Sequence, residues 1–170
     1  EGSICLDDAE KLETVLAELG DDGEVIRLMS QKGQKRKLKM AKGYKTDKAY
    51  IPAGERKLKL LILTPNDKNA RRTGVLWIHG GGYVTGMAGM VHMSRAKNLA
   101  KKYGAVVISP EYRLAGKAPY PAALEDCHAA LLYLKEHATE LGVRSDQIMV
   151  GGESAGGGLA AALCMYEKDA

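Results

Sequence analysis

The 170-residue chain is long enough to bury the core of one domain, and its 45% hydrophobic residues and 20 glycines are typical of a globular α/β protein and exclude a disordered one. Its formal net charge of +4 is modest, and no apolar run approaches the roughly 18 residues that a membrane span needs. Composition thus gives no indication of a nucleic-acid-binding or membrane-spanning protein.

Residues 1–33 carry two short helical patterns. The face of the first helix is formed by Leu12, Val15, Leu16 and Leu19. Gly20 ends this helix, and Gly33 closes a second, shorter apolar face. These helices either cover a site as a lid or lie at the periphery of the fold.

Residues 34–62 are predicted to form antiparallel strands at the edge of a sheet. Segments 37–40 and 57–62 alternate lysines with apolar residues, as in a strand with one solvated face. Residues 48–54 are predicted to supply the turn between them. The many basic side chains between positions 32 and 59 are therefore interpreted as the solvated face of this edge rather than as a nucleic-acid or membrane surface.

Short, unbroken apolar runs later in the chain indicate strands that are buried on both faces. These runs are Val75–Ile78, Ala105–Ile108 and Ile148–Val150. Helical patterns separate them, one ended by Gly104 and a longer one ending near Gly142. The predicted fold class is α/β: residues 34–170 form a doubly wound, mostly parallel sheet with an antiparallel N-terminal edge.

The three cysteines, Cys5, Cys127 and Cys164, are odd in number and widely spaced. They form neither a disulfide framework nor a metal-binding motif, so they are interpreted as small buried hydrophobic residues. This usage favours a reducing compartment, and a cytoplasmic protein is expected. No metal or organic cofactor is implied by the sequence.

The stretch Val150–Gly158 places G-x-S-x-G between a strand and a helical pattern, which is the context of a nucleophile elbow. A turn this sharp brings the backbones of Gly152 and Gly156 together, where a Cβ would clash. Ser154 between them is predicted to be strained, with its hydroxyl lifted clear of the chain. The amide of Ala155 would face an oxyanion formed at this serine.

A second glycine-rich stretch, His79–Gly82, comes after the predicted strand 75–78. Its three successive glycines let amide N–H groups point into a site, where they would form an oxyanion hole with the amide of Ala155. A phosphate-binding loop is the alternative, but neither G-x-x-x-x-G-K-[ST] nor a spaced G-x-G-x-x-G begins here. Both glycine-rich stretches come after strands, where ligands bind in open α/β sheets.

These two stretches, together with Tyr112–Cys127, resemble the hormone-sensitive-lipase group of α/β-hydrolases, the HGGG and G-x-S-x-G carboxylesterases. The order and spacing of all three agree, and the resemblance covers roughly residues 30–166. It implies an α/β-hydrolase fold in which residues 1–33 are N-terminal cap helices. It also implies carboxylesterase or lipase-like hydrolysis of small to medium acyl esters through an acyl-enzyme.

The resemblance also assigns roles to residues. Ser154 is the nucleophile, and the oxyanion-hole amides are those of Gly81, Gly82 and Ala155. The residues that support the two loops are His79, Gly80, Gly152, Glu153 and Gly156. Of these, His79 is expected to order its loop and not to act as the base.

The sequence departs from the pattern of the family at three places. Residues 116–118 replace the usual Pro-Glu-His-like triplet, which we expect to be a mild loop change. Gly158 stands where asparagine is common, and Glu153 stands where aspartate is more common.

The triad of such enzymes has the order Ser, Asp or Glu, His, but residues 155–170 contain no histidine. All four histidines precede Ser154: His79, His92, His128 and His137. His92 is expected in a loop that could approach a pocket, and the last two on the long helix at the surface or core edge. The chain is therefore expected to be the N-terminal part of the hydrolase, truncated after the nucleophile helix, with the triad Asp and His beyond residue 170.

The sequence thus predicts a serine carboxylesterase whose partners are a small-molecule ester and the remainder of the hydrolase, in the same or a separate chain. A homodimer is compatible with this interpretation. The alternatives are a non-catalytic small-molecule-binding homologue, similar to the gibberellin receptors that lack the catalytic histidine, and a chain that is inactive by itself.

Overall fold

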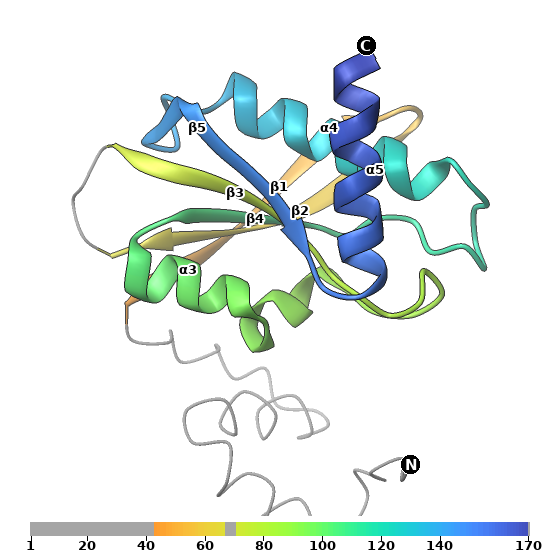
Figure 1. Ribbon diagram of the computed structural model, residues 1–170, viewed down its shortest axis with the longest axis horizontal. Helices are drawn as coiled ribbons and strands as arrows, with labels where there is room; N and C mark the ends of the chain where they lie inside the picture. Colours follow the sequence, from red (N-terminus) through yellow and green to blue (C-terminus); the bar gives the residue numbers. More distant parts are fainter. Residues whose placement is uncertain (1–42, 67–70, 170) are drawn as a thin grey trace, which may run out of the picture. The chain divides into compact units, whose positions relative to one another are not determined.

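A computed structural model describes residues 43–66 and 71–169 of the chain (Figure 1). The cap helices predicted for residues 1–33 and the strand predicted at 37–40 lie outside the described residues, as does Cys5.

The described part forms a five-stranded mixed sheet with helices on both faces. Its strands are β1 (Tyr44–Ala53), β2 (Arg56–Pro65), β3 (Arg72–Ile78), β4 (Val106–Pro110) and β5 (Val143–Gly152). Its helices are the 3-10 helix η1 (Ala88–Met93) and the α-helices α3 (Arg95–Tyr103), α4 (Ala122–Glu136) and α5 (Ala155–Asp169).

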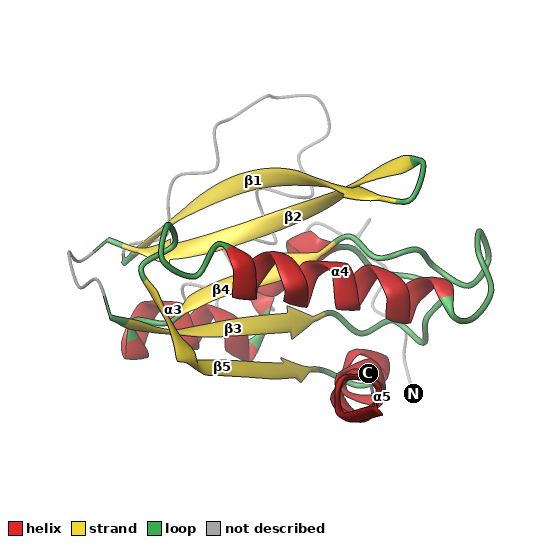
Figure 2. Cartoon of the chain, turned by 90° about the horizontal axis from the view of Figure 1, so that it is seen from above, coloured by secondary structure: helices red, strands yellow, loops and turns green. Residues whose placement is uncertain are grey.

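The strands lie in the order β1-β2-β4-β3-β5 (Figure 2). β1 pairs with β2, and β2 with β4, in antiparallel fashion, whereas β3 is parallel to both β4 and β5. The predicted α/β sheet with an antiparallel N-terminal edge is confirmed. The carboxyl ends of β3 and β5 lie side by side, so the segments after these two strands meet.

The turn predicted at residues 48–54 is wrong, because β1 continues to Ala53, which pairs with Arg56. The reversal occurs after it, where Gly54 adopts a φ of 63°. Most side chains of this edge strand are exposed, so the apolar alternation that marks a strand is weak there. Pro52 suggested a turn, but an edge strand tolerates a residue without an amide hydrogen.

Alternating side chains of the central strands pack on opposite faces of the sheet. On β2, Leu60 and Ile62 join the cluster formed with α4 and α5, whereas Leu61 and Leu63 join the cluster formed with α3 and η1. Figure 1 shows α4 above the sheet and α3 below it. Burial on both faces explains the unbroken apolar runs of β3 and β4. The solvated face predicted for residues 57–62 is wrong, because β2 is buried on both faces from Leu60 to Leu63.

The helix boundaries depend on local capping chemistry. The Ser94 hydroxyl accepts a hydrogen bond from the amide of Ala96 at 3.1 Å and so caps the start of α3. Gly104, with φ 67°, ends this helix as predicted. The longer helix α4 stops at Glu136, earlier than predicted, and turns lead from there to Gly142, whose φ is also 67°.

The two described cysteines differ in environment. Cys127 on α4 is buried, and burial raises the pKa of its thiol. Cys164 on α5 is exposed, which contradicts its predicted burial. The reason is that Leu159, Ala160 and Leu163 occupy the face of α5 that packs on the core. Among the described helices, none combines the length and apolar character needed to cross a membrane.

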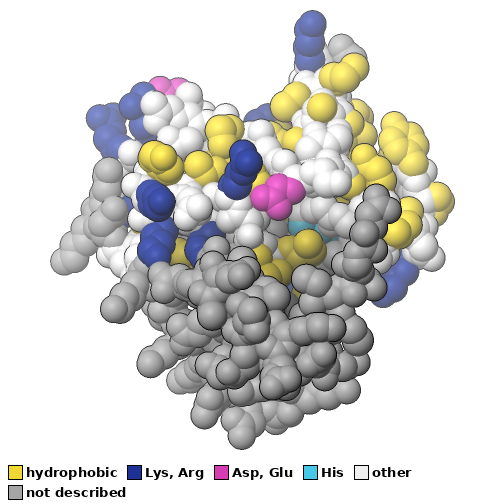
Figure 3. Space-filling view, turned by 60° about the horizontal axis from the view of Figure 1, so that its bottom comes forward, with side chains coloured by type: hydrophobic (Ala, Val, Ile, Leu, Met, Phe, Trp, Pro, Cys, Tyr) yellow, Lys and Arg dark blue, Asp and Glu magenta, His cyan; other side chains and the backbone are white. Residues whose placement is uncertain are grey.

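The far edge of the described sheet carries exposed apolar side chains. β5 has β3 as its partner on one side, and its Met149 is 42% exposed. On the neighbouring α5, Met165 and Tyr166 are 69% and 49% exposed. On the face drawn in Figure 3, most Lys and Arg side chains gather on one side and many hydrophobic side chains on the other.

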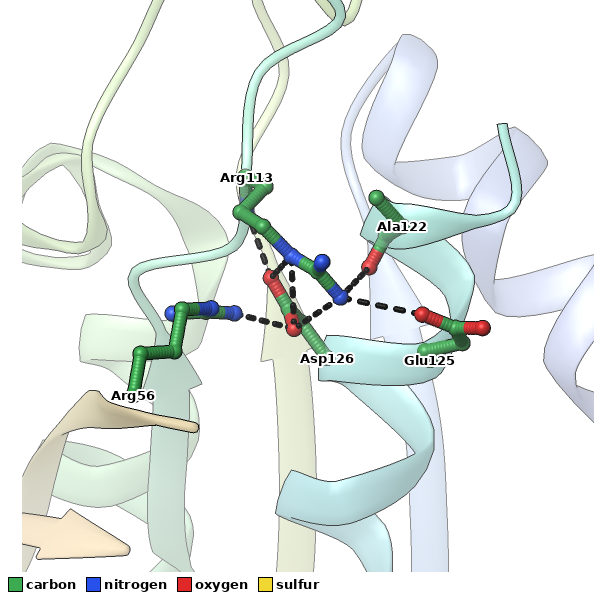
Figure 4. A network of polar contacts seen from close by, with 5 residues as sticks. All are labelled: Arg56, Arg113, Ala122, Glu125 and Asp126. Carbon is green, nitrogen blue, oxygen red and sulfur yellow. Dashed lines mark hydrogen bonds and ion pairs between the residues drawn. The ribbon is translucent and has the colours of Figure 1, made fainter. Parts of the chain in front are cut away.

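A buried carboxylate joins three segments that are distant in sequence (Figure 4). Asp126 on α4 is 1% exposed and accepts hydrogen bonds from the amide, Nε and Nη2 of Arg113, in the segment after β4. It also forms an ion pair with Arg56, at the start of β2. Arg113 Nη2 further donates to the Ala122 carbonyl oxygen and to exposed Glu125. This network fixes the segment after β4 against α4 and the β1–β2 hairpin.

Replacement Asp126→Asn is expected to lower the free energy of unfolding by about 2 to 4 kcal/mol, because it leaves two arginines without their buried counter-charge. The range extends down to about 2 kcal/mol because the side chains of Arg56 and Arg113 are 34% and 32% exposed, so solvent partly screens their charges. Urea denaturation measures the change. The control Glu125→Gln removes an exposed partner of Arg113 and should cost less than about 1 kcal/mol; equal losses in both variants would contradict the role of Asp126.

Candidate active site

Ser154 lies on a tight turn between β5 and α5. Its φ of 52° is in the left-handed region, which is unusual for a residue other than glycine, and the residue is exposed. A Cβ on Gly152 would lie 2.6 Å from the Ile78 carbonyl oxygen, and one on Gly156 would lie 2.6 Å from that of His79. The strained serine and the close backbone approach are as predicted, and glycine is required at both positions.

The two glycine-rich stretches are in direct contact. The amide of Glu153 donates to the carbonyl oxygen of Ile78 at 3.2 Å, which extends the β3–β5 pairing into the turn. A Cβ on Gly80 would lie 2.8 Å from the carbonyl oxygen of Glu153 and 3.3 Å from Cβ of Ser154. Residues that are distant in the sequence are thus packed against each other at the same edge of the sheet.

The loop after Gly80 turns back on itself through a run of positive φ angles: 118° at Gly81, 59° at Gly82 and 65° at Tyr83. The carbonyl oxygen of Gly81 accepts hydrogen bonds from the amides of Val84 and Thr85, at 3.2 and 2.9 Å. Within the described part of the chain, the amides of Gly81 and Gly82 donate no hydrogen bond. These two donors are therefore available to a ligand on this side of the sheet.

His79 is buried beneath this loop. Its Nδ1 lies 2.8 Å from the carbonyl oxygen of Gly80, to which it donates, and its ring stacks on Tyr112 with the ring centroids 4.2 Å apart. The Tyr112 hydroxyl donates to the carbonyl oxygen of His79 at 3.0 Å. Burial lowers the pKa of His79 and raises that of Tyr112 to about 12, so both groups are neutral near pH 7. Sequence reasoning assigned Tyr112 no role of its own, because its packing partner lies 33 residues earlier.

Glu153 connects the serine turn to a second helix. Its Oε1 accepts a hydrogen bond from the amide of Arg95 at 3.2 Å, at the first residue of α3. A carboxylate at a helix N-terminus satisfies a free amide and interacts favourably with the helix dipole. No sequence pattern indicates this contact, because the two residues come together only when α3 packs on the sheet.

The remaining histidines are engaged elsewhere. His92 belongs to η1 rather than to the predicted loop, and its Nδ1 lies 3.1 Å from the hydroxyl of buried Tyr44. His128 pairs with Glu167 at 2.7 Å, and Nδ1 of His137 lies 3.0 Å from the carbonyl oxygen of Tyr133. In residues 43–66 and 71–169, no group of three or more His, Cys, Asp or Glu side chains could hold a metal ion.

This arrangement places an exposed hydroxyl, that of Ser154, next to groups that can stabilise a negative charge. Ser154 is exposed immediately before the N-terminus of α5, whose dipole favours an anion. The unoccupied amides of Gly81 and Gly82 come directly after the glycine that packs against the serine. Donors fixed in this way stabilise an oxyanion without reorganising.

The chain is similar to known proteins in both sequence and structure. Residues 75–170 match a family model described as the alpha/beta hydrolase fold. Esterase LipI of Mycobacterium tuberculosis is 41% identical over 95 residues, which are 56% of this chain and 29% of that protein. Bovine hormone-sensitive lipase is 39% identical over 106 residues, 62% of this chain and 14% of the lipase.

Among solved structures, a bacterial heroin esterase superposes with a TM-score of 0.73 at 33% identity, covering 95% of this chain and 49% of the esterase chain. The thermostable carboxylesterase EstE1 superposes with a TM-score of 0.69 at 29% identity, covering 93% of this chain and 50% of its own. The chain therefore spans about half the length of these esterase structures, and less of the curated relatives.

Replacement Gly156→Ala is expected to lower the free energy of unfolding by about 3 kcal/mol or more, because the added methyl group meets the backbone carbonyls of Ile78 and His79. Urea denaturation measures the loss. The control Gly116→Ala adds the same group where no atom lies within 4 Å and φ is not positive, so it should change stability by less than about 1 kcal/mol. A harmless Gly156→Ala would show that the turn is not packed as described.

Acidification is expected to destabilise the fold near pH 6. Burial lowers the pKa values of His79 and His92 below the ordinary 6.5, so below that pH the unfolded chain binds more protons than the folded one. The two neutral imidazole rings make their full contribution to the free energy of unfolding above pH 6.5. This contribution is lost as the pH falls toward the pKa values of the two histidines in the folded state. Urea unfolding between about pH 7.5 and about pH 5 measures this loss, which should be smaller in His79→Asn. An identical pH dependence in that variant would exclude His79 as a source.

Proposed function

The chain belongs to the α/β-hydrolase fold family, and on that premise we propose that it carries the nucleophile and the oxyanion hole of a hormone-sensitive-lipase-like serine carboxylesterase. Its substrates are small to medium acyl esters, in keeping with the esterases and lipase to which it is similar. The observation that carries the proposal is the turn at Ser154, whose left-handed serine packs on Gly80 of the HGGG stretch.

In the proposed reaction, Oγ of Ser154 attacks the ester carbonyl carbon while a histidine takes its proton. The resulting oxyanion accepts hydrogen bonds from the amides of Gly81, Gly82 and Ala155. Collapse of the tetrahedral intermediate breaks the bond to the alkoxy oxygen, which leaves as the alcohol with the proton from the histidine. Water, deprotonated by the same histidine, then attacks the acyl-enzyme and releases the acid.

We place the base and its acid partner in sequence beyond residue 170. The four histidines of the chain support this placement, because each makes its hydrogen bond or ion pair with a residue other than Ser154. The exposed apolar side chains of β5 and α5 support it too, since further strands of the same enzyme would cover Met149, Met165 and Tyr166. The remainder of the hydrolase is thus the principal protein partner.

A fluorophosphonate probe tests the assignment in the complete hydrolase that we propose. The probe is expected to label Ser154, and Ser154→Ala should abolish labelling and lower kcat for a 4-nitrophenyl ester by about 10⁴-fold or more. Ser145→Ala, at an exposed serine near the start of β5, is the matched control and should keep both properties.

Two outcomes would contradict the proposal. Labelling that persists in Ser154→Ala would place the nucleophile elsewhere. A complete protein that binds ester-like ligands but is neither labelled nor active would instead be a non-catalytic binding homologue.

A further inference from the structure

The Tyr83 side chain rests on the first turns of the helix that begins after Ser154. A Cβ built on Gly158 would lie 2.5 Å from the Tyr83 hydroxyl oxygen and 3.8 Å from its Cζ. The amide of Gly158 donates to the Ser154 carbonyl oxygen at 3.2 Å, so this contact is one helical turn from the serine. The phenol therefore occupies the place that a side chain at position 158 would take.

Tyr83 is also the residue directly after the oxyanion-hole glycines. It adopts a φ of 65°, a conformation that disfavours residues with a Cβ. Its carbonyl oxygen accepts a hydrogen bond from the amide of Ala115 at 2.8 Å, in the loop after β4. Its side chain is 41% exposed, so burial in the core does not hold it. Among the described residues, the contact with Gly158 and the bond from Ala115 restrain this residue, in addition to the hydrogen bonds from Val84 and Thr85 to Gly81 that enclose it.

We propose that Tyr83 is a positioning residue for the oxyanion hole and that Gly158 leaves the space in which its phenol packs. Gly81 and Gly82 have wide conformational freedom because they lack a Cβ, so the direction of their amides must be set by neighbouring residues such as Tyr83. Because the phenol packs on α5, the loop that carries Gly81 and Gly82 is in contact with the helix that begins directly after Ser154. Gly158 provides the necessary space, which a larger residue would fill. This inference rests on the proposed esterase function.

The contact makes a specific prediction about pairs of variants. Gly158→Ala should push the hydroxyl away and displace the loop, lowering kcat by about tenfold or more with a smaller change in KM, because displaced oxyanion donors act on the transition state. Tyr83→Phe removes the atom at 2.5 Å and leaves Cζ at an ordinary contact distance of 3.8 Å. Introducing Gly158→Ala into Tyr83→Phe should therefore lower kcat by less than about threefold.

The experiment measures kcat and KM for a 4-nitrophenyl ester, and the fluorophosphonate labelling rate, in the complete protein and in these single and double variants. Gly89→Ala on η1 is the control for adding a methyl group to a helical glycine, since its nearest atoms are Met87 side-chain atoms at 3.8 Å. It should leave kcat and labelling unchanged. Melting temperatures of all variants report whether any loss of activity results from unfolding.

The proposal would be overturned if Gly158→Ala lowered kcat equally in the parent protein and in Tyr83→Phe. It would also be overturned if Gly158→Ala changed KM and left kcat unchanged. A Gly158→Ala variant with normal kcat would overturn it as well. If the parent protein hydrolyses no ester and is not labelled, the esterase function fails instead. The melting temperatures then still test the contact, because Gly158→Ala should change the melting temperature more unfavourably in the parent protein than in Tyr83→Phe.

Discussion

The close approach of the serine turn to the end of β3 is the constraint on which the rest of the site depends. Gly152 and Gly156 bring two stretches of main chain so near to the Ile78 and His79 carbonyls that neither position has room for a Cβ. This packing leaves Ser154 in a left-handed conformation and exposed, while Gly80 lies against it. A side chain at either glycine would separate the serine from the HGGG loop.

Successive layers of contacts hold the HGGG loop in place. His79 stacks on Tyr112, and the Tyr112 hydroxyl donates to the carbonyl oxygen of His79, so these two contacts fix the first residue of the loop. The next residue along from Tyr112 is Arg113, which binds buried Asp126 on α4. The buried ion pair is therefore connected to the site through a short chain of neighbouring residues.

Under the proposed function, the strands and the turns of the chain have different roles. The central strands bury apolar residues on both faces and provide a rigid base. The chemistry is placed on the turns after β3 and β5, whose strained backbones are stabilised by their surroundings. Glu153 links one of these turns to α3, and Tyr83 links the other to α5. The two halves of the site are therefore joined through α5 as well as through the sheet.

The sequence by itself determined the buried strands β3 and β4, the sheet type and the two glycine-rich turns, because these depend on local patterns of apolar residues and on the absence of Cβ atoms at fixed spacing. The run 148–150 was also predicted to be buried on both faces, but it lies in β5, where Met149 is exposed. It failed at β1, where an exposed edge strand has little apolar alternation and Pro52 suggested a turn. It also failed at Cys164, whose exposure depends on which face of α5 packs on the core. Only the tertiary structure decided the contacts of Tyr83 with Gly158, Glu153 with Arg95 and Arg56 with Asp126. Each joins residues at least 58 positions apart, and no local pattern encodes which distant side chain will fill a given space.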